Sequence, residues 1–248
     1  MRRGIYLIEE VDFRPMNARR PLDYLDWLTR YKREDRERAT HALTSGMSIR
    51  SRDIDLAGAF YAVGITGHRQ FKVITLWECH GGWEGGWRQM MEIYDRVDDK
   101  LFLSDIDDLR FSAVSRPLGS VPGTPVLGEA VAPLYLYERA RVRPGSALDY
   151  LEAVRTEREP VLREHGHTLV GLYEVLFADS EVVTLWAVSL DDHLATQRAR
   201  DAALGLDDEV EGDPRLLEWG RRARHFLDGP WRETLLVPYP GCRLAPAP

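Results

Sequence analysis

The chain has few cysteines, no long hydrophobic run and no excess of positive charge, and each absence excludes a class of protein. Only two of its 248 residues are cysteine, too few for a disulfide framework, which favours a reducing compartment. No apolar run approaches the length of a membrane span, and the first residues lack the apolar stretch of a signal peptide. We therefore expect a cytoplasmic protein without a membrane partner.

Nucleic acid is not an expected partner either. The formal net charge is −7 at neutral pH, and the basic residues are scattered, whereas nucleic-acid binders gather them on one face. The sequence also lacks a Gly-x-Ser-x-Gly elbow, a His-Glu-x-x-His pattern, a phosphate loop and a dinucleotide fingerprint. No metal site is predicted, because His165 and His167 have no partner at metal-ligand spacing.

What the chain does contain is a repeated order of landmarks. A strand-like segment with Tyr-Leu opens each half, at residues 5–11 and 134–140, and Arg-Pro and Leu-Asp-Tyr-Leu follow it. A glycine comes next in each half, and then the segment Thr-Leu-Trp, which ends at Trp77 and again at Trp186. Four landmarks in the same order indicate an internal duplication of domain size.

Each half shows the element order β-α-β-β-α-β, which is the ferredoxin-like pattern. Apolar residues at helical spacing follow each first strand, and turn-forming residues separate the two middle strands. The middle strands are predicted at 56–63, 71–78, 169–176 and 181–188, further helical residues at about 83–102 and 191–228, and the last strands near 109–116 and 232–238.

A proline- and glycine-rich segment divides the halves. Three prolines and two glycines within residues 117–125 disfavour a helix or a central strand. We therefore predict a first ferredoxin-like unit at 1–116, a linker at 117–131 and a second unit at 132–248. The first half also has an insertion, whose charged stretch at 32–38 is typical of a solvent-facing helix surface, with a lid as the alternative.

Three segments of the second half resemble a known family. They are Tyr-Leu-Tyr-Glu-Arg-Ala-Arg-Val-Arg-Pro-Gly at 135–145, His-Gly-His-Thr-Leu-Val-Gly at 165–171, and Val-Val-Thr-Leu-Trp-Ala at 182–187 followed by Ser-Leu. Together they span most of residues 133–240 and resemble a NIPSNAP-type domain of the dimeric α/β-barrel superfamily. The first half is similar more loosely.

The resemblance implies an α+β fold in which two ferredoxin-like units pack sheet to sheet and close a barrel within one chain. The superfamily includes cofactor-free monooxygenases, isomerases, haem enzymes and proteins without known chemistry, so the fold alone does not choose an activity. Relatives usually have arginine at the positions of Glu9 and Glu138, and histidine at the positions of Thr75 and Thr184.

Glu9 and Glu138 are the candidate catalytic residues. They occupy the same position of the first strand in each half, next to the apolar Leu7 and Leu136. A carboxylate on a buried face is costly unless it is paired or its pKa rises, and a raised pKa would suit a general base that removes a proton from an activated C–H or O–H. The alternatives are a structural pairing with an arginine, or a position at the exposed end of the strand.

The Thr-Leu-Trp strands supply candidate substrate-binding residues. Strand alternation puts Thr75 and Trp77 on one face of their strand, and Thr184 and Trp186 on one face of theirs. If this face lines the cavity of the implied barrel, the four side chains form a mostly apolar pocket suited to a small organic ligand. The alternative is that both tryptophans are core residues.

A glycine-rich segment, His-Gly-Gly-Trp-Glu-Gly-Gly-Trp at 80–87, follows the first of these strands. Its glycines free the backbone, so it could present His80, Trp83 and Trp87 at the rim of the cavity. The alternative is a flexible turn whose tryptophans anchor the next helix.

These observations favour an enzyme that binds a hydrophobic or aromatic metabolite and performs acid/base chemistry without a cofactor, by oxygenation, isomerisation or cyclisation. The alternatives are a non-catalytic NIPSNAP-type binding or interaction protein, and a haem-binding protein, for which one axial histidine would suffice. The expected partner is a small-molecule substrate. We expect a monomer with an internal pseudo-dimer, or a homo-oligomer.

Overall fold

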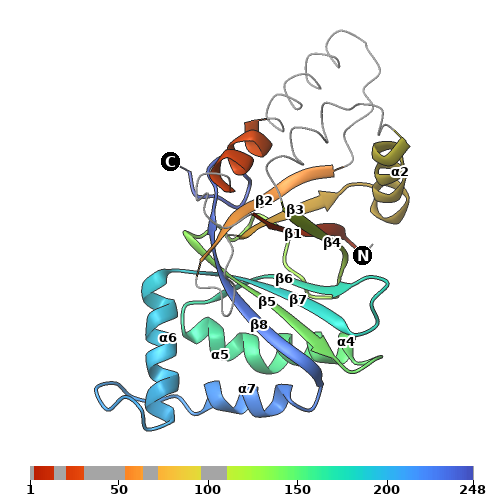
Figure 1. Ribbon diagram of the computed structural model, residues 1–248. Helices are drawn as coiled ribbons and strands as arrows, with labels where there is room; N and C mark the ends of the chain where they lie inside the picture. Colours follow the sequence, from red (N-terminus) through yellow and green to blue (C-terminus); the bar gives the residue numbers. More distant parts are fainter. Residues whose placement is uncertain (1–2, 14–20, 31–53, 64–71, 96–110, 248) are drawn as a thin grey trace. The chain divides into compact units, whose positions relative to one another are not determined.

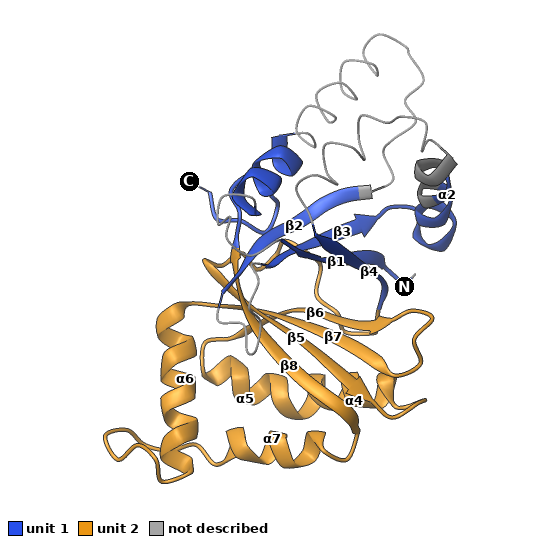
Figure 2. Ribbon diagram, in the orientation of Figure 1, with its two compact units in different colours: residues 1–63, 67–119, 238–248 blue, residues 64–66, 120–237 orange. Residues whose placement is uncertain are grey.

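The computed structural model describes residues 3–13, 21–30, 54–63, 72–95 and 111–247. They belong to two compact units, one formed by residues 1–63, 67–119 and 238–248 and the other by residues 64–66 and 120–237 (Figure 2). Three predicted features lie outside the described residues: the charged stretch at 32–38, the turn-forming residues between the strands predicted at 56–63 and 71–78, and the end of the helical region expected at 83–102. None of the described helices is long and apolar enough to cross a membrane.

The described elements follow the predicted α+β pattern (Figure 1). The first unit contains β1 (Ile5–Asp12), helical residues 21–30, β2 (Ile54–Val63), β3 (Lys72–Cys79), α2 (Gly82–Asp95) and β4 (Ser112–Ser120). The second unit contains β5 (Leu134–Val142), α4 (Ala147–Ala153), the π-helical turn η1 (Val154–Arg158), α5 (Glu159–Glu164), β6 (Thr168–Val175), β7 (Glu181–Val188), α6 (Leu190–Ala203), α7 (Arg215–Ala223) and β8 (Leu227–Pro238).

Each unit has a four-stranded antiparallel sheet with the same strand order. In the first unit β3 pairs with β2 and β1, and β1 also pairs with β4. In the second unit β7 pairs with β6 and β5, and β5 also pairs with β8. Glu9 lies opposite Thr75 as Glu138 lies opposite Thr184. The registers therefore agree at the landmark positions, while a duplication as the origin of the two units remains a prediction.

The recurring glycine has a steric role in both sheets. The register shifts just before Gly58 in β2 and just before Gly171 in β6. A Cβ at Gly171 would lie 2.2 Å from a ring carbon of Tyr173, and a Cβ at Gly58 would lie 2.4 Å from the ring of Phe60. Both distances are too short for a side chain, so each bulge requires glycine.

The chain makes further backbone hydrogen bonds just beyond the ends of β4 and β8. Beyond the end of β4, Val121 N donates to the carbonyl of Leu172 in β6 at 3.3 Å, and beyond the end of β8, Tyr239 N donates to the carbonyl of Ala59 in β2 at 2.7 Å. The hydrogen-bonded strands follow the order β1-β3-β2-β8-β5-β7-β6-β4, which is a closed barrel. This confirms the expected fold class.

Two of the predicted boundaries differ from the structure. Residues 117–120 belong to β4 and not to the linker, and Pro117 pairs with Leu7; a proline removes only one ladder donor, so the strand continues through it. The last residues of the chain pack with the first unit and not with the second, because the Tyr239 hydroxyl donates to Asp26 at 2.6 Å and Leu244 N donates to the carbonyl of Ala57 at 3.1 Å.

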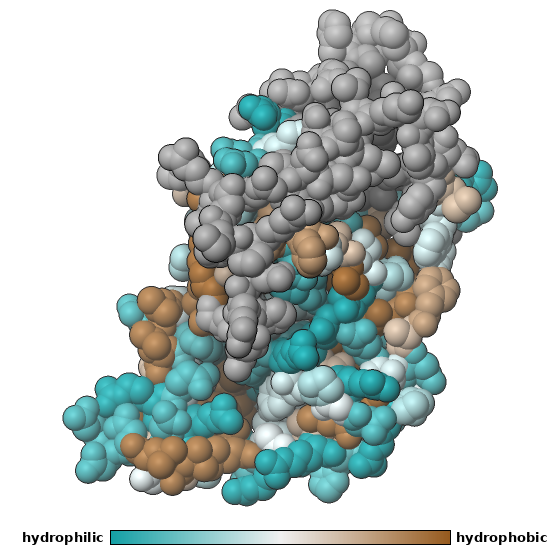
Figure 3. All heavy atoms as spheres, in the orientation of Figure 1, coloured by the Kyte–Doolittle hydropathy of each residue, from teal (hydrophilic) through white to brown (hydrophobic). Residues whose placement is uncertain are grey.

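Helices cover one face of the second unit's sheet (Figure 1). The core on this face joins Val182 and Trp186 of β7 to Tyr150 and Leu151 of α4 and to Trp219 of α7. Trp186 thus faces the helices of its own unit. The pocket predicted from the sequence required the face with Thr184 and Trp186 to line the barrel cavity, and in this unit it does not. Figure 3 shows a mainly hydrophilic surface where the loop between α6 and α7 lies, with hydrophobic residues beside it.

Candidate functional site

The site in the second unit begins with an irregular helix. Residues 147–164 run through α4, η1 and α5, and the π-helical turn ends two residues before Pro160. Pro160 has no N–H to donate to the carbonyl four residues earlier, so the regular hydrogen-bond ladder is interrupted at this point. Arg158 is the last residue of the π-helical turn, and its guanidinium is buried beneath the sheet, with only 6% of the residue exposed.

Arg158 forms a buried ion pair with Glu138 of β5. Arg158 Nη1 donates to Glu138 Oε2 at 2.5 Å, and Nη2 donates to Oε1. Thr184 Oγ1 donates to Glu138 Oε2 at 2.5 Å, and Trp186 Nε1 donates to the same oxygen at 3.0 Å. Glu138 is therefore paired with an arginine from outside its own strand. This is the structural pairing that the sequence left open as the alternative to a general base.

Three tryptophans surround the guanidinium of Arg158. Its central carbon lies 5.4 Å from the ring centroid of Trp186, 5.6 Å from that of Trp219 and 5.1 Å from that of Trp231. Each distance is within the range of a cation–π interaction. The aromatic rings thus stabilise a buried positive charge that would otherwise be costly.

A second carboxyl group, Glu233 of β8, lies opposite Glu138 across the strand pair. Arg158 Nη2 also donates to Glu233 Oε1, at 3.5 Å. Burial and the negative charge of Glu138 raise the pKa of Glu233 to about 8. Burial alone would raise the pKa of Glu138 too, but the charge and hydrogen bonds of Arg158 outweigh it and lower that pKa to about 2.

The two glutamates therefore differ in charge at neutral pH. Glu138 is a fixed anion, and Glu233 is mostly protonated. Like charges close together favour one shared proton over two ionised groups. The group whose pKa is raised is Glu233, and not Glu138 as the general-base hypothesis required.

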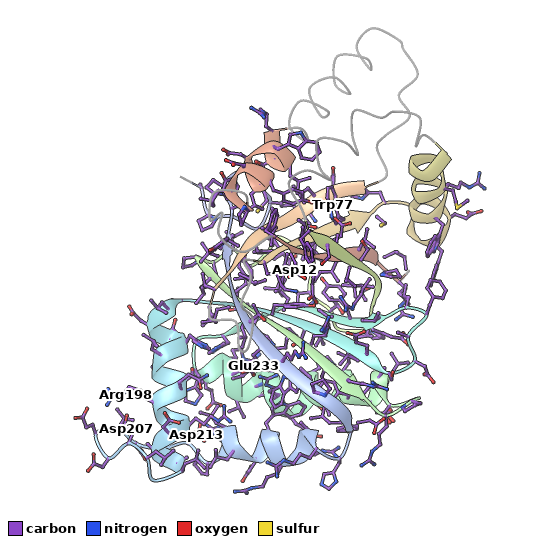
Figure 4. The ribbon with its side chains drawn as sticks, viewed as in Figure 1. Asp12, Trp77, Arg198, Asp207, Asp213 and Glu233 are labelled. Atoms are coloured by element: carbon purple, nitrogen blue, oxygen red, sulfur yellow. The ribbon has the colours of Figure 1, made fainter. Side chains whose placement is uncertain are left out.

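A cavity of about 230 Å³ adjoins this pair within the second unit. The walls are mainly aromatic, aliphatic and arginine side chains from β5, β8, η1, α5, α6 and α7, including Leu136, Arg158, Leu216, Trp219, Trp231 and Glu233. Figure 4 shows Glu233 on β8 and Asp213 in the loop between α6 and α7. Because ligand pockets are commonly about 300–1,000 Å³, this cavity suits a compact molecule.

Three buried nitrogen atoms of residues around the cavity lack a partner. Among the described residues, no hydrogen-bond partner is found for Trp219 Nε1, Trp231 Nε1 or His193 Nδ1. An orphaned buried polar group is unusual and costs free energy.

Two neutral histidines lie at the edge of the cavity. His167 Nδ1 donates to the carbonyl of His165 at 3.1 Å, and its ring contacts that of His193 at 5.9 Å between centroids. Burial lowers the pKa of His167 to about 4 and also lowers the pKa of His193. Within the described part of the chain, no group of three or more potential ligands could hold a metal ion.

The first unit repeats part of this arrangement around Glu9. Thr75 Oγ1 and Trp77 Nε1 donate to Glu9 Oε2 at 3.2 and 3.1 Å, as Thr184 and Trp186 do to Glu138. Ser115 Oγ donates to Glu9 Oε1 at 2.9 Å. Both halves of the chain thus place a carboxylate, a threonine and a tryptophan in direct contact.

The glycine-rich segment forms the start of α2 in the first unit. Trp83 and Trp87 are helical residues of α2, and Trp83 is exposed. His80 Nε2 lies 3.1 Å from Asp55 Oδ2 at an exposed position. None of these three residues lines the cavity beside Glu233.

Four residues of the site are not predicted from the sequence: Arg158, Glu233, Trp219 and Trp231. A signal for Glu233 does exist, because strand alternation puts Trp231, Glu233 and Leu235 on one face of the last strand. The strand pairing that brings this face to Glu138 is not visible in the sequence. Arg158 depends on the helix geometry that Pro160 sets.

Comparisons with known proteins show the fold and leave the function open. No protein-family model and no curated protein matches the chain. An anthrone oxidase-like protein of known structure superposes with a TM-score of 0.58 over 98% of this chain and 96% of its own, at 11% identity. A proposed monooxygenase from Fusobacterium nucleatum subsp. nucleatum ATCC 25586 superposes with a TM-score of 0.54 over 95% and 93%, also at 11% identity.

NIPSNAP proteins of known structure cover less than half of this chain. A NIPSNAP domain protein from Burkholderia xenovorans is 24% identical but covers 44% of this chain and 97% of its own, with a TM-score of 0.34. A superposition this low carries no argument. The chain therefore has the fold of dimeric α/β-barrel proteins, and its activity has to be argued from the site.

Proposed function

We propose that the protein is an enzyme that binds a small hydrophobic or aromatic metabolite in the cavity of the second unit and acts on it by acid/base chemistry without an organic cofactor. The observation that carries this proposal is the pair Glu138 and Glu233 beside Arg158, at a cavity with tryptophan walls. The cavity differs from the barrel interior expected from the sequence, because it lies on the helix-covered face of one sheet. We also infer that the two units arose by duplication.

In this proposal Glu233 exchanges the proton and Glu138 keeps its charge. Glu233, with a pKa of about 8, donates a proton at neutral pH, and its ionised form accepts one. Arg158 neutralises negative charge that develops on the substrate, for example on an enolate or phenolate oxygen. Proton transfer of this kind suits oxygenation of an electron-rich ring, isomerisation or cyclisation.

Native mass spectrometry of the purified protein tests this function. We expect a bound metabolite that is lost in Gln197→Trp, which fills the cavity, and kept in Ala195→Trp, an exposed position of the same helix that does not line the cavity. Incubation of the released metabolite with wild type and Glu233→Gln then compares their products. A metabolite that Gln197→Trp still binds would contradict the proposed site.

The second candidate is a non-catalytic binding protein. It is supported by the full set of hydrogen bonds on Glu138, which is what a structural ion pair requires. In that case Glu233→Gln and wild type bind the metabolite, and neither converts it into another compound, whether of different mass or an isomer separated by chromatography. An absorption spectrum after haem is added tests the haem-binding hypothesis, since a Soret band is required for it.

A further inference from the structure

His167, which directly precedes β6, is a buried histidine that the proposed proton exchange does not use. It lines the cavity beside Glu233, and only 2% of the residue is exposed. Its ring atom Nδ1 lies 3.1 Å from the carbonyl oxygen of His165. A carbonyl oxygen can only accept a hydrogen bond, so Nδ1 carries a hydrogen. In the neutral ring the second nitrogen, Nε2, then has a lone pair and no hydrogen.

The surroundings of His167 keep its ring neutral. Burial lowers its pKa to about 4, and the positive charge of Arg158 acts in the same direction, against the hydrogen bond to His165 and the charge of Glu138. Among the described residues, no carboxylate is hydrogen-bonded to this ring, whereas His165 Nε2 lies 3.0 Å from Asp213 Oδ2. Nε2 of His167 is therefore a hydrogen-bond acceptor at neutral pH.

This acceptor borders open space. Nε2 has no hydrogen-bond partner in the described part of the chain, and yet the sealed side-chain atoms that lack a partner include Nδ1 of His193 and not Nε2 of His167. A nitrogen that is neither bonded nor sealed can be reached by a small molecule. Since His167 is almost entirely buried, such a molecule occupies one of the two cavities that the residue lines.

Two observations favour the cavity beside Glu233 over the second one, which has a volume of about 320 Å³ and lies between residues 123–130, α5 and the start of β6. The ring of His167 contacts the ring of His193, which lines the first cavity and not the second. The charges of Arg158 and its partner Glu138, beside the first cavity, also act on His167. The ring therefore faces the cavity of the proposed function.

We propose that His167 Nε2 accepts a hydrogen bond from a hydroxyl group of the ligand in this cavity, and that the ligand is a compact phenol or enol. This inference rests on the proposed function, because it names the ligand class of the same cavity. A hydroxyl offers one donor to the single acceptor, and the rest of the ligand contacts apolar walls that include Leu136, Leu162 and Leu216. The oxygen of a phenol or enol can also bear the negative charge that Arg158 neutralises in the proposed reaction.

His167 orients this hydroxyl and does not take its proton. A histidine whose pKa is about 4 is a much weaker base than a phenolate, since a phenol has a pKa of about 10. The hydrogen therefore stays on the oxygen when the ligand binds, and proton exchange remains with Glu233. His167 is thus a residue that selects the ligand.

Phenol and fluorobenzene are matched probes, since they are similar in shape and only phenol has a hydroxyl donor. Their binding can be followed by NMR through the methyl signals of Leu136 and Leu216, which line the cavity. At neutral pH we expect wild type to bind phenol about threefold to tenfold more tightly than fluorobenzene, the range of one net hydrogen bond between neutral groups. This binding should be lost in Gln197→Trp and kept in Val126→Trp, an exposed position that lines only the second cavity.

His167→Asn tests the acceptor itself. Asparagine has an N–H in the position of Nδ1, which can bond to the carbonyl of His165, and no atom in the position of Nε2. The two probes should therefore bind this variant about equally, whereas exposed His225→Asn should keep the preference for phenol.

A spectrum of wild type provides a test that does not depend on the folding of a variant. Two-bond proton–nitrogen correlations distinguish a ring nitrogen that carries a hydrogen from one that does not. We expect Nε2 of His167 to carry none at neutral pH, and its signal to shift with phenol more than with fluorobenzene.

The outcomes separate this inference from the function on which it rests. Equal affinities of wild type for the two probes, a phenol preference that persists in His167→Asn, or a hydrogen on Nε2 overturns the hydroxyl contact and leaves the cavity as a small-molecule site. Phenol binding that survives in Gln197→Trp, or methyl signals that respond to neither probe, overturns it as well. The proposed function fails only if Gln197→Trp retains the co-purified metabolite.

Discussion

Arg158 is the residue on which the second unit's site depends, because it neutralises Glu138 in the core. Arg158→Met leaves that carboxylate buried without a positive partner, and we expect a loss of about 3–5 kcal/mol in the free energy of unfolding. Arg155→Met, three residues earlier and on the half-exposed side of the same turn, should change it by less than about 1 kcal/mol. Urea unfolding compares the two, and equal stabilities would contradict a structural role for the buried pair.

Glu233 should make stability depend on pH. Its pKa is about 8 in the folded chain against an ordinary value of 4.5, so the native state holds a proton that the unfolded chain releases, and stability falls as pH rises towards about 8. The slope should be below the about 1.4 kcal/mol per pH unit of one full proton, because 37% of the side chain is exposed and water screens it.

The window for this measurement is set by His167. Burial lowers the pKa of His167 from 6.5 to about 4. Its titration therefore raises the free energy of unfolding as pH rises from about 4 to about 6.5, whereas the titration of Glu233 lowers it. Between about pH 6.5 and about pH 8 the slope therefore comes from Glu233 and should disappear in Glu233→Gln. The same slope in both proteins would show that the carboxyl group is not perturbed.

At the residue level the sequence predicts part of this site. The apolar neighbours of Glu138 predict burial, and pairing with an arginine was one of the alternatives they left open. The identity of that arginine depends on a helical turn about twenty residues later, and the raised pKa of Glu233 depends on a cross-strand neighbour. Neither contact leaves a local pattern.

The element that positions Arg158 is the π-helical turn before Pro160. Pro160→Ala restores an N–H that can donate to the carbonyl of Thr156, so a regular helical turn can form and Arg158 moves relative to Glu138. We expect a net loss of stability of about 2–4 kcal/mol, because one new hydrogen bond contributes only about 1 kcal/mol and the broken pair costs about 3–5 kcal/mol.

A double-mutant cycle isolates this effect. In the Arg158→Met background the ion pair is already absent, so Pro160→Ala should be neutral or stabilising there. Stabilisation by Pro160→Ala in both backgrounds would show that the proline does not position Arg158.

Elements with strong local patterns are the ones that the sequence predicts well. The middle strands agree with β2, β3, β6 and β7 to within a few residues, because alternation and turn residues mark both ends. The first half of the Pro/Gly segment is β4 instead, since pairing with β1 outweighs the local preference of Pro117. The π-helical turn has no periodicity by which it could be recognised.

At the scale of the whole molecule, the last residues of the chain belong to the first unit. Residues 238–247 contribute backbone hydrogen bonds to β2, an ion pair from Arg243 to Glu78 and the fully buried side chain of Leu244 to the first unit. Deleting residues 238–248 should increase hydrogen exchange in β2 and β3 and leave β5 and β7 protected. Deleting only residues 246–248 should have little effect, and equal exchange in both sheets would contradict the assignment of the tail to the first unit.

The fold class could be predicted from the repeated landmarks together with the family resemblance, and the strand order agrees with it. The tail could not be placed from the sequence, because its contacts with Ala57 and Ala59 join residues far apart in the chain. Long-range pairings of this kind follow from the closed strand order and have no short-range signal.

The proposed function depends on two neighbouring carboxyl groups, Glu138 and Glu233, whose pKa values differ widely. Carbon NMR of the glutamate side chains between about pH 2 and about pH 10 measures this directly. We predict one carboxyl that titrates near pH 8, absent in Glu233→Gln, and one that stays ionised to about pH 2, absent in Glu138→Gln. Titration of both groups near the ordinary glutamate value of 4.5 would contradict the proton-exchanging pair and the function built on it.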